Sequence, residues 1–391
     1  MAIAIGVVVL LAIAGWDLLL RSPTGTATEG ACPALAQGPL SVENTTADLG
    51  GVFQAGSIQA FGSNQTSILL GGLSAFDQSA VPFVSEPAAA ELAGTPGSSA
   101  AINLTSLLAP YFSGGGIFPP VWNGSAWLIA GQTRVAGELE GSAVFLQGSR
   151  VTDLTSLLSP FFRGQGIFIA GWDGTGWLIG GNETSEASLV YLENGAVTNL
   201  SGLIPHNRAG DWVQVIGWNG AAWLVGGFGV FGTWSAGRYT DLYPTSAFTS
   251  GGVYALGWNG SAWLASGEPA VLEVLDGSSL TTGPGLSNWT TGWVSSIVPL
   301  AGGWLLAGAS STSDGKYNPR VELSGGEAGR GVLDVSACLP GAFSGGWVQF
   351  ASGADPLPPG SVLLVGEGRT NPVTGSSHGA AATIGLPLDH P

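Results

Sequence analysis

The sequence predicts an all-β protein built from repeated units of short strands, and near copies of one segment are the first reason. Each copy places an Asn-Gly or Asp-Gly pair between two tryptophans. One such unit cannot bury its own apolar face, so its recurrence indicates a repeat fold. The copies are VWNGSAWLIAG from Val121, GWDGTGWLIGG from Gly171, GWNGAAWLVGG from Gly217 and GWNGSAWLASG from Gly257.

The spacing of the copies is the second reason. The unit recurs about every 40 to 50 residues, a period typical of solenoids and propellers. Two weaker copies, at 57–73 and 346–368, flank the others and bring the expected number of units to seven. The second tryptophan of each clear unit is Trp127, Trp177, Trp223, Trp263 or Trp304.

Each unit resolves into four short strands when it is divided by turn residues and alternation. In the third unit we expect strands at 166–172, 176–181, 188–195 and 196–200. The Asp-Gly and Asn-Gly pairs suit tight hairpin turns, because Gly, Asn and Asp tolerate positive φ best. Four antiparallel strands per unit, without a helical period, predict a seven-bladed β-propeller.

Closure of the ring is expected to use the start of the chain. The last unit supplies three strands, and residues 39–49 match the slot that the fourth strand fills elsewhere. An N-terminal strand is therefore predicted to complete the seventh blade, with a hydrophobic helix before it. The domains expected are a transmembrane anchor or signal segment at 1–21, a linker at 22–38 and the propeller at 39–391.

The first twenty residues predict contact with a membrane. Their one ionisable side chain is Asp17, and residues 2–20 would span about 28 Å as a helix, close to the hydrocarbon thickness of a bilayer. An uncleaved anchor and a removed secretory signal both stay open. The protein is expected on the extracytoplasmic face of the membrane, or secreted if this segment is cleaved.

Two cysteines, Cys32 and Cys338, are predicted to form a disulfide in an exported chain. They would join the outer strands of the last two blades at the ring seam. Unpaired buried thiols, or lipidation of Cys32, are the alternatives.

Acceptor triplets for N-glycosylation are frequent and suit an exported surface. The alternative is that Asn, Ser and Thr are simply turn residues. The candidate acceptors are Asn44, Asn64, Asn103, Asn123, Asn182, Asn199, Asn259 and Asn288.

A paired glycine after the second strand is followed about ten residues later by an apolar or aromatic strand, as in Gly180-Gly181 and then Tyr191. This arrangement resembles the kelch repeat. The resemblance spans most of the propeller region and implies the radial architecture.

Charge and composition exclude several functions. With 26 acids against 10 bases, of which Lys316 is the one lysine, the formal net charge is −16, so nucleic acid is not an expected partner. Three histidines in the whole chain do not suit a metal site, and no cofactor is expected. No nucleophile or phosphate-loop motif is found, which favours a non-catalytic protein and leaves an enzyme as the weaker alternative.

Binding residues are expected in the loops that lead into the inner strands, where the units diverge. There we expect Phe161 to cap a blade core, and residues 74–99 form a second candidate loop. The repeated tryptophans are assigned to packing between blades rather than to sugar recognition. The candidate binding residues are Arg163, His206, Arg208, Asp211 and Trp212.

The sequence therefore predicts an extracytoplasmic, membrane-tethered propeller that binds or scaffolds protein or glycan partners, with residues 2–20 in the membrane. One alternative is a carbohydrate-active hydrolase or lyase on the same scaffold. Another is an accessory subunit of a membrane or cell-surface assembly.

Overall fold

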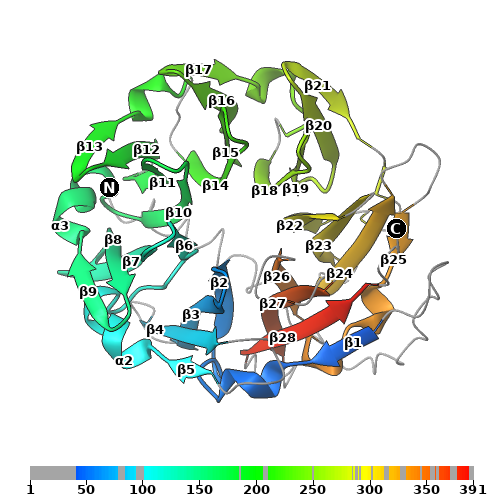
Figure 1. Cartoon of the computed structure of the whole chain (residues 1–391), viewed down its shortest axis with the longest axis horizontal. Coiled ribbons are helices and arrows are strands. Elements are labelled where there is room, and N and C mark those ends of the chain that lie inside the picture. Colours follow the sequence, from blue (N-terminus) through cyan, green and yellow to red (C-terminus); the bar gives the residue numbers. More distant parts are fainter. Residues whose placement is uncertain are drawn as a thin grey trace.

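The computed structural model shows a ring of antiparallel sheets, with the first strand of each unit nearest the centre and the last at the rim (Figure 1). The all-β class is confirmed. The structure describes residues 41–77, 84–93, 101–184, 186–205, 210–248, 251–283, 285–286, 289, 292–300, 303–311, 317–325, 332–343, 346–352, 357, 361–369 and 377–386.

Three blades of the first half follow one another along the chain, each a four-stranded sheet. They are β2 (Ser57–Ser63), β3 (Ser67–Asp77), β4 (Val84–Ala93) and β5 (Ile102–Asn103); β6 (Val121–Trp122), β7 (Trp127–Val135), β8 (Glu138–Gln147) and β9 (Arg150–Asp153); and β10 (Gly166–Trp172), β11 (Trp177–Glu183), β12 (Glu186–Glu193) and β13 (Ala196–Asn199).

The next strands form one eight-stranded sheet of two successive four-strand blades. The pair Phe228 and Gly252 links the β14–β17 and β18–β21 blades into this one sheet. Their strands are β14 (Trp212–Trp218), β15 (Trp223–Phe228), β16 (Phe231–Ser235), β17 (Arg238–Asp241), β18 (Gly252–Trp258), β19 (Trp263–Glu268), β20 (Leu272–Asp276) and β21 (Ser279–Thr282).

The last two sheets bring the two ends of the described chain together. The first strand, β1 (Ser41–Asn44), pairs antiparallel with β28 (Ser377–Gly385) and is the fourth strand of the sheet that contains β26 (Trp347–Ser352) and β27 (Ser361–Arg369). The N-terminal strand thus lies where the sequence places it. The remaining sheet holds β22 (Gly292–Leu300), β23 (Gly303–Ser311), β24 (Tyr317–Gly325) and β25 (Val332–Asp334).

Short helices follow several outer strands. The α-helices are α2 (Thr105–Leu108) and α3 (Thr155–Leu158). The 3-10 helices are η1 (Thr46–Leu49), η2 (Ala109–Tyr111), η3 (Ser159–Phe161), η4 (Ser201–Leu203), η5 (Tyr243–Thr245), η6 (Ser336–Cys338) and η7 (Gly341–Phe343).

The strands predicted in the third unit agree with the structure to within about two residues, the usual uncertainty of strand ends. The first, 166–172, is β10, and the fourth, 196–200, differs from β13 by one residue. The turn between β10 and β11 forms because Asp173 Oδ1 accepts hydrogen bonds from the backbone N–H groups of Thr175 and Gly176, each at 2.8 Å.

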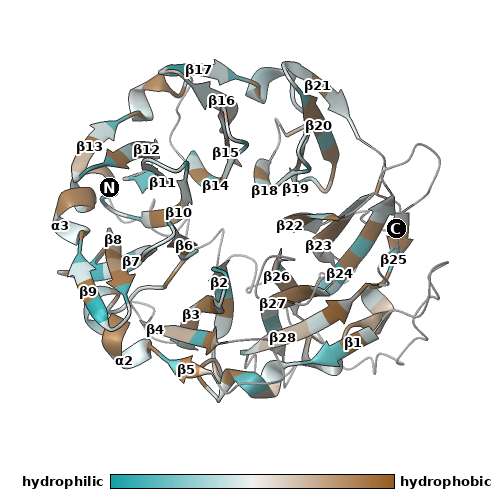
Figure 2. Ribbon diagram, viewed as in Figure 1, coloured by the Kyte–Doolittle hydropathy of each residue, from teal (hydrophilic) through white to brown (hydrophobic). Residues whose placement is uncertain are grey.

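Apolar side chains from neighbouring sheets form the core. Leu128 and Ala130 of β7 pack with Ile167 and Ile179 of the next blade in one buried cluster. Figure 2 shows that the outer strands β1 and β9 carry mainly hydrophilic residues, and only one of four residues in each is partly buried. Each sheet is therefore stabilised by covering its neighbour's faces, as radial repetition requires.

Connections between blades insert buried aromatic side chains into this core. Phe112, Phe162 and Phe248 are 0% exposed and lie in the connections that lead to β6, β10 and β18. Phe161, the residue expected to cap the blade, is half-buried and packs against the same core cluster that contains Phe162. The cap therefore includes Phe161, and Phe162 is its fully buried member.

Two other expectations change or fall outside the described residues. Much of 74–99 is not a loop, because β3 runs to Asp77 and β4 begins at Val84. The anchor at 1–21, the linker at 22–38 and Cys32 lie outside the described residues, so the pairing with Cys338, which packs against a core cluster, stays a prediction. Within the described part of the chain, no helix has the length and apolar character needed to span a membrane.

Candidate functional site

The residues expected to bind a partner do not share one environment. Arg163 is exposed, and Trp212 is half-buried at the start of β14. His206 and Arg208 lie outside the described residues. Asp211 is only 5% exposed, which corrects its assignment as a binding residue.

Asp211 is buried because it joins two blades. Its carbonyl oxygen accepts a hydrogen bond from Asn182 Nδ2 at 2.7 Å. Its carboxylate lies against Gly229, where φ is +70° and a Cβ would clash with the carboxylate oxygens. Asn182 is itself 0% exposed, so this candidate glycosylation site is also corrected, since its amide is inaccessible and bonded within the fold.

Trp212 forms a partly exposed aromatic stack with Phe228. The two residues face each other across the β14–β15 pair, with ring centroids 4.9 Å apart and an interplanar angle of 13°. Trp212 Nε1 donates to Gln214 Oε1 at 3.1 Å, and Phe228 is 37% exposed. A flat apolar surface with an amide group at its edge suits a planar or extended ligand.

The same tryptophan–glutamine arrangement recurs in the sheet formed by β26, β27, β28 and β1. Trp347 Nε1 donates to Gln349 Oε1 at 2.9 Å, and Trp347 meets Trp293 of the neighbouring sheet at 6.5 Å, edge to face. The indoles occupy the first position of β26 and the second of β22. Aromatic side chains thus collect at the start of several inner strands.

A β-bulge lies near the start of most inner strands and sets apart one residue in each of them. The pairing of the first and second strands shifts by one residue at the same place in successive blades. In the β6–β9 blade Pro119 and Pro120 cannot donate to the ladder, and β6 is correspondingly short. The residues at this position, here called the inner tier, are Gln59, Phe118, Phe168, Gln214, Tyr254, Ser295 and Gln349.

Members of the inner tier interact around the ring. The rings of Phe118 and Phe168, in adjacent blades, meet edge to face at 5.6 Å. Ser295 Oγ donates to the carbonyl oxygen of Val348 in the next sheet at 2.7 Å. Because the tier lies on the strands nearest the centre of the ring (Figure 1), it forms a belt of aromatic, amide and hydroxyl groups there.

One member of this belt, Tyr254, lies beside a carboxylate. Tyr254 bonds to the Glu268 carboxylate, and burial together with that charge raises the pKa of Tyr254. Burial also raises the pKa of Glu268, which the Tyr254 hydrogen bond partly opposes. Among the residues that the structure describes, no three His, Cys, Asp or Glu side chains gather to hold a metal ion.

Comparison with known proteins identifies the architecture. No family model matches the chain, and no curated protein sequence matches it. A structure of YCF48 bound to D1 peptide superposes with a TM-score of 0.54 at 11% identity, covering 92% of this chain and 100% of that one. Chaetomium thermophilum Sqt1 bound to the N-terminus of the ribosomal protein L10 gives 0.52 at 9%, with 80% and 84% covered. The chain has a β-propeller fold.

Packing accounts for the repeated tryptophans of this propeller. The second tryptophan of the unit is buried at Trp127, Trp177, Trp223 and Trp263, between 2% and 5% exposed. The first is half-buried and lies against the second across the hairpin turn, as Trp172 does on Trp177 at 4.8 Å. The interpretation of these residues as packing residues agrees with the structure.

Backbone hydrogen bonds account for many of the acceptor triplets. After the outer strands, Oδ1 of Asn44, Asn103 or Asn199 accepts from the N–H two residues on, and Asp153 does the same in the β6–β9 blade. An aspartate cannot carry a glycan, so the turn at this position forms without a glycan acceptor. Exposure keeps these three asparagines available as acceptors.

The hairpin turns between first and second strands form the other group. Oδ1 of Asn64, Asn123 and Asn259 accepts backbone hydrogen bonds as Oδ1 of Asp173 does. Asn288 lies outside the described residues. Both groups support the turn interpretation, and glycan attachment stays a prediction.

Proposed function

We propose that this chain is a seven-bladed, kelch-like β-propeller, counting the eight-stranded sheet as two blades, that binds an extended segment of a protein partner at the starts of its inner strands. The observation that carries the proposal is the Trp212–Phe228 stack with its Gln214 neighbour. Large aromatic side chains that stay partly exposed are typical of binding surfaces.

A peptide fits this surface better than other ligands. Aromatic rings pack against apolar side chains, while primary amides such as Gln59, Gln214 and Gln349 can both donate to and accept from a peptide backbone. The similar structures of YCF48 and Sqt1 were each solved with a peptide or a protein N-terminus bound. Their low identity limits the likeness to the fold, so the peptide chemistry is argued from the inner tier itself.

The setting we propose follows the sequence. Residues 2–20 would tether the propeller to the extracytoplasmic face of a membrane, or direct its secretion, and Cys32–Cys338 would join that segment to the ring seam. Glycans on exposed acceptors such as Asn103 and Asn199 would cover the rim.

The test is binding to a displayed library of random linear peptides, followed by affinity measurement on the selected sequences. Trp212→Ala and Phe228→Ser should each weaken binding at least tenfold, as loss of an interface hot spot does. Ile102→Ser is the matched control, because Ile102 is 51% exposed at the rim strand β5. The proposal fails if no peptide is selected, or if the control weakens binding as much as the stack variants.

Glycan binding is the second candidate, because the same exposed rings could stack on the C–H face of a sugar. A glycan array with the full-length protein separates the two functions. Sugar binding that is lost with Trp212→Ala, in a protein that selects no peptides, would replace the peptide proposal.

A further inference from the structure

A small pocket lies at the other end of the strands, beside the turn that follows β6. Its volume is about 260 Å³, and it is lined by Asn123, Ala126, Phe145, Gln147, Arg150 and Thr152. Sites for drug-sized ligands are usually larger, about 300 to 1,000 Å³. The space therefore fits a single residue or a single sugar ring.

The β10–β13 blade shows what fills the equivalent space there. Tyr191 stands where the β6–β9 blade has Phe145, since each is paired with the second residue of its neighbouring strand. The Tyr191 hydroxyl donates to Asp173 Oδ2 at 2.8 Å and lies 3.1 Å from Thr175 Oγ1. Gly176 makes room for the ring, because a Cβ there would clash with it.

The β6–β9 blade has none of these three filling features. Phe145 lacks the hydroxyl, Ala126 replaces the glycine, and Asn123 replaces the aspartate. The Phe145 ring lies against Trp177 of the next blade at 5.7 Å. A self-filled pocket in one blade is thus open in its neighbour.

The polar groups around the open pocket are one guanidinium, two amides and a hydroxyl, all of which can donate hydrogen bonds. Asn123 Oδ1 already accepts from the N–H groups of Ser125 and Ala126, so the amide presents Nδ2 to the pocket. Arg150 is exposed and forms no ion pair with a residue that the structure describes. An arginine with amide and hydroxyl neighbours suits a carboxylate, and the Phe145 ring suits an apolar face next to it.

We propose that this pocket binds a carboxylate attached to a ring or side chain of single-residue size. The acid could be a uronic acid or the carboxyl-terminal residue of a peptide, which share the carboxylate and the adjoining apolar face. This site is separate from the surface proposed to bind a peptide, because it lies at the opposite end of the strands from the Trp212–Phe228 stack.

Ligand-observed NMR titrations of the full-length protein, made in a host without N-glycosylation so that Asn123 keeps a free amide, test the proposal. Glucuronate and N-acetyl-leucine are the two acids, and glucose and N-acetyl-leucine N-methylamide are their neutral counterparts. At least one acid should bind with a millimolar Kd and its counterpart at least about tenfold more weakly, as expected for losing a charged hydrogen bond. Whichever acid binds identifies the source of the carboxylate.

Two variants locate the site. Arg150→Gln should weaken acid binding at least about tenfold, whereas Arg238→Gln, at the equivalent position of the β14–β17 blade, should leave it unchanged. The triple variant Asn123→Asp, Ala126→Gly, Phe145→Tyr copies the self-filled blade and should abolish binding while the protein stays folded by circular dichroism. Absence of acid binding, equal binding of the neutral ligands, or equal effects of both arginine variants would overturn the proposal, and peptide selection at the stack would be unaffected.

Discussion

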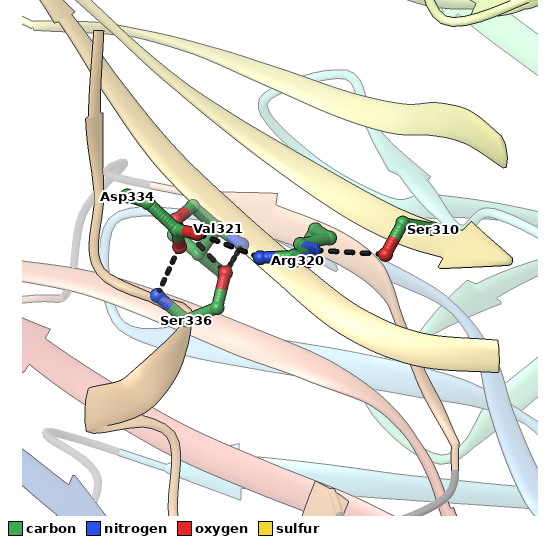
Figure 3. A network of polar contacts seen from close by, with 5 residues as sticks. All are labelled: Ser310, Arg320, Val321, Asp334 and Ser336. Carbon is green, nitrogen blue, oxygen red and sulfur yellow. Dashed lines mark hydrogen bonds and ion pairs between the residues drawn. The ribbon is translucent and has the colours of Figure 1, made fainter. Parts of the chain in front are cut away.

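The β10–β13 and β22–β25 blades hold their outer strands in the same way but differ in charge. Asn199 Oδ1 in one and Asp334 Oδ1 in the other accept from the backbone N–H of the serine two residues on. That serine then bonds to backbone atoms of the third strand. In the β22–β25 blade Asp334 also pairs with Arg320 at 2.6 Å (Figure 3). The repeat therefore requires the backbone contacts and leaves the charge free to vary.

The blades differ again at one buried position on the third strand. Val190 and Glu322 are paired with equivalent residues of the second strand, and both are 0% exposed. Burial, and then the charge of Asp334, raise the pKa of Glu322 to about 7, while Trp289 and Arg320 oppose the shift. This buried position is thus apolar in the β10–β13 blade and titratable in the β22–β25 blade.

Removing the buried aromatic before the β10–β13 blade is expected to have the largest effect. Phe162→Ala should lower the free energy of unfolding by about 3–5 kcal/mol, since it leaves a cavity between two sheets. Chemical denaturation monitored by tryptophan fluorescence measures this. Phe161→Ala is the control, because Phe161 is half-buried, and an equal loss for both variants would contradict the packing described.

The contribution of Glu322, in the β22–β25 blade, to the pH dependence of stability should come next. The folded state holds the Glu322 proton more tightly than the unfolded chain, whose glutamate titrates near 4.5. Stability from this group is therefore complete below about pH 4.5 and is lost as the pH rises toward 7, by up to about 3 kcal/mol. Denaturation midpoints measured from pH 4.5 to 8 should show the fall.

Two variants sharpen this expectation. Glu322→Gln should remove that part of the pH dependence, because the amide does not titrate. Trp289→Phe should raise the pKa of Glu322 further, since the indole opposes the shift. A pH profile that is the same in wild type and in Glu322→Gln would assign the dependence to other carboxylates.

The β10–β13 blade was also the easier one to predict. Its strands could be placed because Asp173-Gly174 marks the hairpin turn and the alternation of apolar residues is regular. The bulge at Phe168 could not be predicted from the sequence, because a bulge shifts the strand register without changing the pattern of residue types.

Long-range contacts limited the site prediction. Asp211 and Asn182 were assigned to the surface as a loop acid and a glycan acceptor, but they bond to each other across two blades. Nothing local in the sequence reports such a pairing. The inner tier was missed for a related reason, since its members share a position in space and differ in residue type.

Breaking the ion pair of the β22–β25 blade should cost less than the changes above. Arg320→Met removes the bonds to Asp334 and to Ser310 Oγ (Figure 3). Both partners of the pair are 26% exposed, so solvent screens the pair and the expected loss is about 1 kcal/mol. Thermal unfolding in low and high salt measures it, and a loss that does not shrink in high salt would point to packing of the arginine stem.

A serine occupies the same position in both blades, and its loss should cost no more than loss of the ion pair. Ser201 Oγ accepts from the N–H of Leu189 at 3.0 Å, and Ser336 Oγ accepts from that of Val321 at 2.9 Å. Ser201→Ala and Ser336→Ala should each lower the free energy of unfolding by about 1 kcal/mol, the usual net value of a hydrogen bond. Denaturation at pH 5 and at pH 8 compares them. Ser336 lies beside Asp334, and Glu322 belongs to the same blade. The loss of unfolding free energy should therefore change with pH only in Ser336→Ala. Equal pH dependence in both variants would mean that the carboxylates do not affect the hydrogen bond of the outer strand.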